Sequence, residues 1–177
     1  QNLASLLAEL NDLPIPSIVR VQGAAYGGAI GLIACCDIAI ISDNARFCLS
    51  EVKLGLAPAT IGPYVVSAMG ARRCRKLFLT AELFNAEQAE QFGLAHQIVA
   101  LDDLDTSVDA TLEQLLKAGP MATRAAKQLI ADIEKGQSDM SAMTSELIAR
   151  LRVSPEGQEG LSAFFEKRSP AWIETYE

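Results

Sequence analysis

The order of short elements between residues 17 and 41 constrains the fold more than any other feature of the chain. Ser17 to Gln22 (SIVRVQ) is short and rich in β-branched residues, which predicts a strand. Gly23 to Gly28 (GAAYGG) is predicted as a turn, and Ala29 to Cys36 as a short apolar helix. Ile38 to Ile41 is predicted as a second, buried strand. A strand, a turn, a helix and a second strand in this order are typical of an α/β fold.

Helical spacing of apolar residues dominates the rest of the chain. The first predicted helix, Asn2 to Leu13, ends before Pro14 because proline disfavours the helical conformation of the residue before it. Two more short strands are predicted, at Phe47 to Leu49 and at His96 to Val99. The other predicted helices span residues 61–69, 71–79, 86–92, 101–117, 121–134, 141–152 and 155–167.

Gly119-Pro120 is the clearest boundary between predicted elements. We therefore expect an α/β core over residues 1–118 and a helical region over residues 119–177. The predicted strands are too few to complete a doubly wound sheet, so we expect part of the domain to lie outside this chain.

Composition excludes several classes of protein. Half of the 177 residues are hydrophobic and 21% are charged, which excludes a disordered or low-complexity chain. The formal net charge of -7 argues against a sequence-independent nucleic-acid binder, which needs a basic surface. The best candidate for a transmembrane run, Ile30 to Ile41, is interrupted by Asp37 and is shorter than the ~20 residues required. We expect neither nucleic acid nor a membrane as a partner.

The cysteines and the single histidine lack the spacing of a metal site. Cys35, Cys36, Cys48 and Cys74 form no C-x-x-C pair, and His96 is the only histidine. Buried, reduced thiols are the simpler interpretation. This spacing leads us to expect no metal ion. Because the N-terminal residues also lack the pattern of a signal peptide, we expect a cytoplasmic protein.

Two consecutive glycines, Gly27 and Gly28, lie where a predicted strand leads into a predicted helix. The segment is neither G-x-G-x-x-G nor G-x-x-x-x-G-K-[ST], so it supports neither a dinucleotide site nor a P-loop. Glycines let a ligand approach the backbone, and the first N–H groups of a helix have no partner within it. These donors can hold a developing oxyanion. A tight turn without a ligand is the alternative, and the segment by itself favours that alternative.

Glu51 is the carboxyl group that the sequence singles out. It lies in F-C-L-S-E-V-K-L-G-L-A-P-A, just after a predicted strand and among apolar residues. A carboxyl group in such surroundings is poised for proton transfer. The alternative is a helix start at Ser50, with Glu51 exposed near Lys53. The residues alone support both interpretations equally.

Three longer segments carry a resemblance to a known family. They are P-I-P-S-I-V-R-V-Q-G-A-A-Y-G-G-A-I-G-L-I-A-C-C-D-I-A-I, then A-R-F-C-L-S-E-V-K-L-G-L-A-P, then E-G-L-S-A-F-F-E-K-R. In this order they resemble the enoyl-CoA hydratase/isomerase (crotonase) family, from about residue 2 to the end of the chain. The segments A-C-C-D-I-A-I, L-S-E-V-K-L-G-L and R-V-S-P-E-G-Q-E-G are most similar to bacterial methylglutaconyl-CoA hydratases.

The resemblance implies a fold and an assembly. The family fold is a spiral of ββα turns followed by C-terminal helices that join subunits into trimers, often paired as hexamers. The chain would then hold the C-terminal part of the spiral over residues 1–118 and oligomerisation helices over residues 119–177. The absent first turns would carry one oxyanion-hole amide and much of the loop that binds the CoA adenine.

The resemblance also implies roles for individual residues. Gly28 matches an oxyanion-hole N–H donor, and Glu51 matches a catalytic glutamate. Lys167 matches a lysine that reaches the CoA of a neighbouring subunit. The family's other catalytic glutamate falls at Gly31, and Ala59 stands where many hydratases have a glycine.

Tyr26 and Gly27 complete the candidate substrate-binding residues, together with Gly31, Ala59 and Lys167. Tyr26 would line the acyl pocket, although a packed tyrosine with a satisfied hydroxyl is the more common arrangement.

The activity that the resemblance implies is the addition of water to a 2-enoyl-CoA thioester such as methylglutaconyl-CoA, in leucine and isovalerate breakdown. With Gly31 in place of a glutamate, the alternatives are a single-glutamate isomerase and a CoA-ester-binding homologue without turnover. The expected partners are the acyl-CoA thioester and further copies of the chain. Proton transfer and oxyanion stabilisation suffice for this chemistry, so we expect no metal or redox cofactor.

Overall fold

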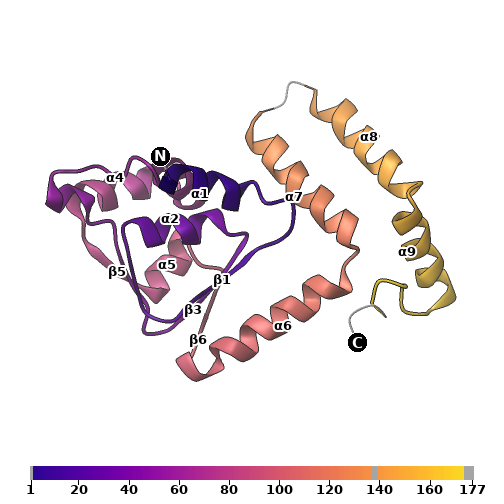
Figure 1. Cartoon of the computed structure of the whole chain (residues 1–177), viewed down its shortest axis with the longest axis horizontal. Helices are drawn as coiled ribbons and strands as arrows, with labels where there is room; N and C mark the ends of the chain where they lie inside the picture. The colour runs from indigo at the N-terminus through magenta and orange to yellow at the C-terminus, as the bar shows by residue number, and fades with distance from the viewer. Residues whose placement is uncertain (1, 137–138, 174–177) are drawn as a thin grey trace. The chain divides into compact units, whose positions relative to one another are not determined.

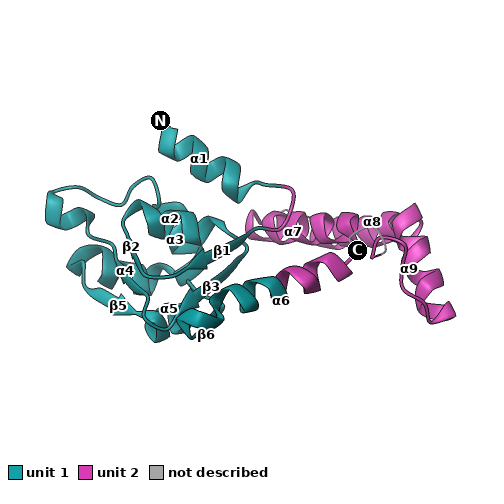
Figure 2. Cartoon of the chain, turned by 60° about the horizontal axis from the view of Figure 1, so that its bottom comes forward, with its two compact units in different colours: residues 1–13, 17–110 teal, residues 14–16, 111–177 magenta. Residues whose placement is uncertain are grey.

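The computed structural model describes residues 2–136 and 139–173, which form two compact units (Figure 2). Unit 1 takes residues 1–13 and 17–110, and unit 2 takes residues 14–16 and 111–177. The division falls within helix α6 (Leu104–Lys117). The domain boundary expected after residue 118 stays a prediction.

The described part of unit 1 contains two three-stranded sheets. The first sheet is parallel and has the order β1 (Ile18–Val21), β3 (Ile38–Ser42) and β6 (Gln97–Val99). The second has the order β2 (Ala24–Tyr26), β4 (Arg46–Cys48) and β5 (Leu83–Asn85), with β2 and β4 parallel and β5 antiparallel to β4. Figure 1 labels β1, β3 and β6 of the first sheet and β5 of the second.

From β1 to β4, consecutive strands occupy different sheets, so this part of the chain forms a spiral. β1 leads into β2, helix α2 (Gly28–Cys35) follows, and β3 and β4 then repeat the path one turn later. Ile18 pairs with Ile38 in the first sheet, and Ala24 pairs with Arg46 in the second. This arrangement confirms the expected α/β fold, with helices at its C-terminal end.

The remaining helices of unit 1 have ends that their sequences explain. They are α1 (Asn2–Asn11), α3 (Gly62–Met69), α4 (Ala71–Thr80) and α5 (Ala86–Phe92), with the 3-10 helices η1 (Glu51–Leu54) and η2 (Leu101–Asp103). Asn85 Oδ1 accepts a hydrogen bond from Gln88 N, and Gln88 Oε1 accepts one from Asn85 N, both at 3.0 Å, which is a capping box at the start of α5. Gly70 and Gly93 end α3 and α5 with positive φ angles of 80° and 88°, as expected for glycines at helix C-termini.

A continuous apolar core holds these elements together. Phe47 of β4 stacks on Phe84 of β5 with ring centroids 5.2 Å apart. Leu7, Ile30 and Ile41 are fully buried and bring α1, α2 and β3 into the same cluster. Helix α2 contacts both α1 and α3. The start of α2 is therefore fixed relative to the strands on either side of it.

Unit 2 is helical. Besides the second half of α6 it contains α7 (Pro120–Glu134), α8 (Met140–Arg152) and α9 (Pro155–Glu166). The Glu156 carboxylate of α9 accepts hydrogen bonds from Met121 N (2.8 Å) and Ala122 N (2.7 Å). These are first-turn N–H groups of α7, which have no acceptor within the helix. Glu156 therefore links the start of α7 to α9.

Two short strands differ from the expectations. The segment 23–28, predicted as a turn, contains β2, because residues 24–26 pair with β4. The strand β5 was not predicted at all. Residues 101–117, predicted as one helix, form the 3-10 helix η2 up to Asp103 and then α6 from Leu104.

In the part of the chain that the structure describes, no helix has both the length and the apolar character needed to cross a membrane.

Candidate active site

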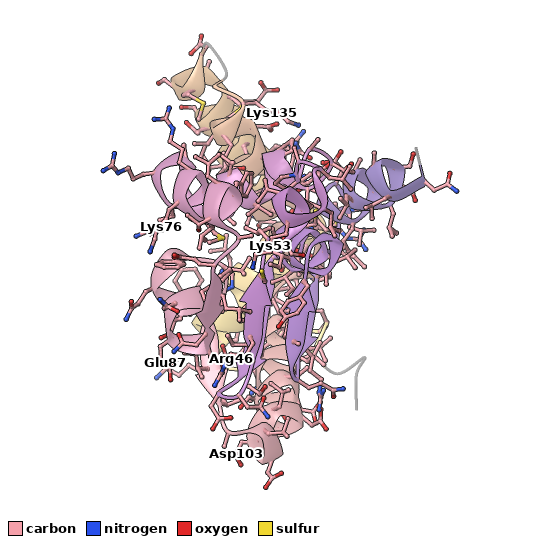
Figure 3. The ribbon with its side chains drawn as sticks, turned by 90° about the vertical axis from the view of Figure 1, so that its left-hand side faces the viewer. Arg46, Lys53, Lys76, Glu87, Asp103 and Lys135 are labelled. Atoms are coloured by element: carbon pink, nitrogen blue, oxygen red, sulfur yellow. The ribbon has the colours of Figure 1, made fainter. Side chains whose placement is uncertain are left out.

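The glycine turn and Glu51 follow the ends of two neighbouring parallel strands. β2 ends at Tyr26 and is followed by Gly27, while β4 ends at Cys48 and leads through Ser50 to Glu51. Parallel strands that pair side by side place the segments after them at the same edge of the sheet. Figure 3 labels Arg46 at the start of β4 and Lys53 in η1, between which this path can be followed.

Gly27 has a backbone conformation that side chains disfavour. Its φ is 52° and its ψ is -120°. Its N–H donates to the carbonyl of Cys48 at 3.0 Å, which continues the pairing of β2 with β4 beyond the strand. Its carbonyl accepts from Ile30 N at 2.9 Å, which closes the first turn of α2. The turn thus joins the sheet to the helix through both of its backbone polar groups.

Gly28 is the first residue of α2. Its N–H makes no hydrogen bond within the described residues. Such a donor at the positive end of a helix suits a ligand oxygen that gains negative charge.

The carboxylate of Glu51 lies against this turn. A Cβ added at Gly27 would be 3.3 Å from Oε1 of Glu51. Oε2 of Glu51 is buried and has no hydrogen-bond partner among the described residues. A buried carboxylate oxygen without a hydrogen-bond partner lowers the stability of the fold, and such an oxygen is typical of a site that binds a ligand. The helix start expected at Ser50 is present, because η1 begins at Glu51, although the Ser50 side chain makes no capping hydrogen bond. The exposed Glu51 of that alternative is wrong, because Oε2 is buried.

Gly31 lies one turn into α2 and is buried against Ile61. A Cβ added at Gly31 would lie 2.3 Å from Cγ2 of Ile61, closer than any real contact. This residue pair was not predicted from the sequence, since the two positions are far apart along the chain and neither has a local signal for the contact.

The other candidate substrate-binding residues have different surroundings. Tyr26 is 50% exposed and its hydroxyl makes no hydrogen bond with a described residue, which differs from the packed tyrosine with a satisfied hydroxyl. Ala59 is exposed in the loop between η1 and α3, where its N–H donates to Ala57 O. Lys167 follows α9 in unit 2 and has a positive φ of 55°.

The cysteines are buried or partly buried thiols. Burial, with smaller contributions from the neighbouring Cys36 and Asp12, raises the pKa of Cys35 to about 12. Burial also raises the pKa of Cys74. These thiols are protonated at neutral pH and are poor nucleophiles. Within the ranges 2–136 and 139–173, no three His, Cys, Asp or Glu side chains are grouped as metal ligands.

Comparisons with known proteins identify the family of the chain. Residues 1–175 match the family model for enoyl-CoA hydratase/isomerase. Carnitinyl-CoA dehydratase from Proteus mirabilis is 32% identical over 172 residues, which cover 94% of this chain and 66% of that protein.

Solved structures show the same fold. The crystal structure of an enoyl-CoA hydratase from Shewanella pealeana superimposes with a TM-score of 0.91 at 52% identity, covering 96% of this chain and 64% of that one. AtuE from Pseudomonas aeruginosa gives a TM-score of 0.92 at 37% identity, covering 97% of this chain and 67% of that one. The chain thus spans about two thirds of the length of these relatives. Since the family match extends over nearly all of its residues, the chain belongs to the enoyl-CoA hydratase/isomerase family.

Proposed function

We propose that the full-length protein acts on an enoyl-CoA thioester, with Glu51 as the group that transfers protons. The observation that carries this proposal is the Glu51 carboxylate, which lies against the glycine turn with one oxygen buried and unpartnered. A carboxylate beside an unpaired helix N–H group combines the two functions that enolate chemistry needs, a proton carrier and an oxyanion donor.

In the proposed hydration, Glu51 removes a proton from water and the hydroxyl oxygen bonds to the β-carbon of the enoyl group. The electron pair of the double bond shifts toward the thioester, whose oxygen becomes an enolate. Gly28 N–H donates to this oxygen, together with an amide from a segment outside this chain. Glu51 then gives its proton to the α-carbon, so the carboxylate is restored and one water has been added.

Double-bond isomerisation is the second candidate, and the surroundings of Gly31 favour it. Glycine offers no carboxylate there, and Ile61 fills the adjacent space. Glu51 alone would take a proton from one carbon and return it to another, without water. Binding of CoA esters without turnover is the third outcome, and the same missing carboxylate motivates it.

For the substrate we propose a short or branched 2-enoyl-CoA such as methylglutaconyl-CoA, which would place the protein in leucine and isovalerate breakdown in the cytoplasm. The support is the similarity of residues 34–40, 49–56 and 152–160 to methylglutaconyl-CoA hydratases. A related protein is named for a different acyl group, carnitinyl-CoA, so the family accommodates several. Tyr26 and the backbone near Ala59 are the proposed contacts to the acyl group.

We also propose that the protein assembles into trimers or hexamers through unit 2. Phe164 and Phe165 are each 76% exposed, and Ile148 is 64% exposed. A groove between α7 and α8 is lined by apolar side chains, among them Leu129 and Leu151. In this assembly Lys167 would reach the CoA bound by a neighbouring subunit.

Replacement of Glu51 by glutamine tests the proposed function. Glu51→Gln keeps the shape of the side chain and removes its ability to carry a proton. We expect turnover of enoyl-CoA, measured by loss of the enoyl absorbance and by the mass of the product, to fall by ~10²–10⁴. Glu90→Gln is the matched control, because Glu90 is exposed on α5. Unchanged turnover in Glu51→Gln would refute the proposal.

A further inference from the structure

The contact between Gly31 and Ile61 has a consequence for the chemistry of the site. A Cβ at Gly31 would lie 2.3 Å from Cγ2 and 2.8 Å from Cβ of Ile61. The next neighbour, Cδ1 of Leu7, would be at 3.6 Å, which is an ordinary contact. The side chain of Ile61 thus occupies the space that any side chain at position 31 would need.

Ile61 has little freedom to move away. It is 2% exposed and belongs to the main apolar core. Its carbonyl accepts a hydrogen bond from Val65 N at 3.1 Å, which fixes it at the start of α3. Its β-branched side chain has few alternative rotamers. The overlap at position 31 therefore cannot be relieved by a small shift.

Ile61 and Glu51 approach the same end of α2. The Glu51 carboxylate lies against Gly27, the residue before the helix, and Ile61 lies against Gly31. Four residues correspond to about 6 Å along a helix axis. A side chain at position 31 would thus start about one turn from the carboxylate of Glu51.

We infer that Ile61 is a specificity-determining residue, because its side chain excludes a second proton-carrying group from the first turn of α2. This inference rests on the proposed function of Glu51. It means that helix α2 supplies no second carboxylate beside Glu51. It also means that a glutamate at position 31 requires a smaller residue at position 61.

The first arm of the test measures stability and does not depend on activity. In the full-length protein, Gly31→Ala should lower the melting temperature while Ile61 is present. The same change should still be unfavourable beside Ile61→Ala, because the two Cβ atoms would be 2.8 Å apart. Beside Ile61→Gly it should raise the melting temperature, because alanine favours a helix over glycine. Val65→Ala is the control, since Val65 is fully buried and lies farther than Ile61 and Leu7 from a Cβ at Gly31.

The second arm measures the reaction. Gly31→Glu combined with Ile61→Gly should raise the ratio of hydration to isomerisation about 10²-fold over Gly31→Gln combined with Ile61→Gly. Gly31→Glu with Ile61 intact should misfold or show no such gain.

The outcomes separate two failures. If Gly31→Ala is equally unfavourable in all backgrounds, or if Gly31→Glu gains hydration with Ile61 intact, the inference about Ile61 is wrong. If no variant with Glu51 intact, wild type included, turns over any enoyl-CoA, the proposed function fails, whatever the stability measurements show.

Discussion

The Glu51 carboxylate lies directly against Gly27, at 3.3 Å from the position of a Cβ on that glycine. The two residues are brought together by the parallel pairing of β2 with β4, which Gly27 N–H extends to the carbonyl of Cys48. A carboxylate and a helix start whose first N–H has no partner among the described residues therefore share one sheet edge. Any residue at position 27 other than glycine would both strain the backbone and displace the carboxylate.

Gly28 offers a direct test of the backbone donor. Gly28→Pro removes the N–H, and proline is tolerated at the first position of a helix. We expect turnover of enoyl-CoA to fall ~10²–10³-fold with the fold retained, as when one oxyanion donor is lost. Gly28→Ala keeps the N–H, and its Cβ would be 3.7 Å from Leu3, so it should retain most activity. Equal activity of the Gly28→Pro and Gly28→Ala variants would show that this N–H does not stabilise the oxyanion.

Lys167 combines a strained backbone with an ammonium group that no described residue pairs. Its φ of 55° suits glycine, so Lys167→Gly should stabilise the protein by about 1 kcal/mol. If the ammonium binds CoA in a neighbouring subunit, the same variant should raise KM for the CoA ester and leave kcat unchanged. Lys167→Arg, which keeps the charge, should retain the lower KM. A more stable Lys167→Gly with an unaltered KM would limit this lysine to a structural role.

The ion pair of Glu159 and Arg168 predicts a dependence of stability on pH. Arg168 donates to both carboxylate oxygens of Glu159 at 2.6 and 2.9 Å, and Ala171 N donates at 2.8 Å. These bonds lower the pKa of Glu159 from 4.5 to about 2. Because the folded pKa lies below the unfolded one, the stabilisation is complete above pH 4.5 and is lost as the pH falls toward 2.

Urea unfolding of wild type and Glu159→Gln between pH 7 and pH 3 measures this effect. The difference in unfolding free energy should be constant above pH 4.5 and shrink below it. The effect will be small because the pair is exposed to solvent. Glu113→Gln, on the exposed face of α6, should show no such pH-dependent difference. A difference that grows as the pH falls would contradict the assignment.

Phe164 and Phe165 predict how the protein assembles. Their rings meet edge to face at 5.7 Å and both are 76% exposed. Burying each ring stabilises an interface by roughly 1.5–3 kcal/mol, so replacement of both by serine should reduce the trimer or hexamer to smaller species in light scattering. Leu79→Ser is the control, because Leu79 is 77% exposed in unit 1. A wild-type protein that is monomeric at micromolar concentration would overturn the proposal.

The helices could be predicted from the sequence because their ends have local signals. Asn85 with Gln88 begins α5, and Gly70 and Gly93 provide the positive φ angles at two helix ends. The strands β2 and β5 could not be predicted in this way. Each has three residues, and both exist because they pair with β4, which lies elsewhere in the chain. The residues Ala24–Tyr26, within GAAYGG, look like a turn without that partner.

The site could likewise be predicted only where local sequence patterns determine it. The positions of Gly28 and Glu51 after strands follow from local patterns, but the burial of the Glu51 carboxylate depends on the pairing of β2 with β4. That is why the sequence could not decide whether Glu51 is exposed, although it did indicate the helix start at Ser50. The contact of Gly31 with Ile61 joins two separate helices and therefore has no signature in either segment.

That contact also constrains how the chain can change by single substitutions. A larger residue at position 31 is accommodated only after position 61 has lost its side chain, so the order of the two substitutions is fixed. The intermediate has a cavity in its core, which costs roughly 2–5 kcal/mol of the 5–15 kcal/mol that stabilises a typical domain. A related protein with a second carboxylate at position 31 is thus separated from this protein by a less stable intermediate. Evolution through that intermediate requires other substitutions that first raise the stability of the fold.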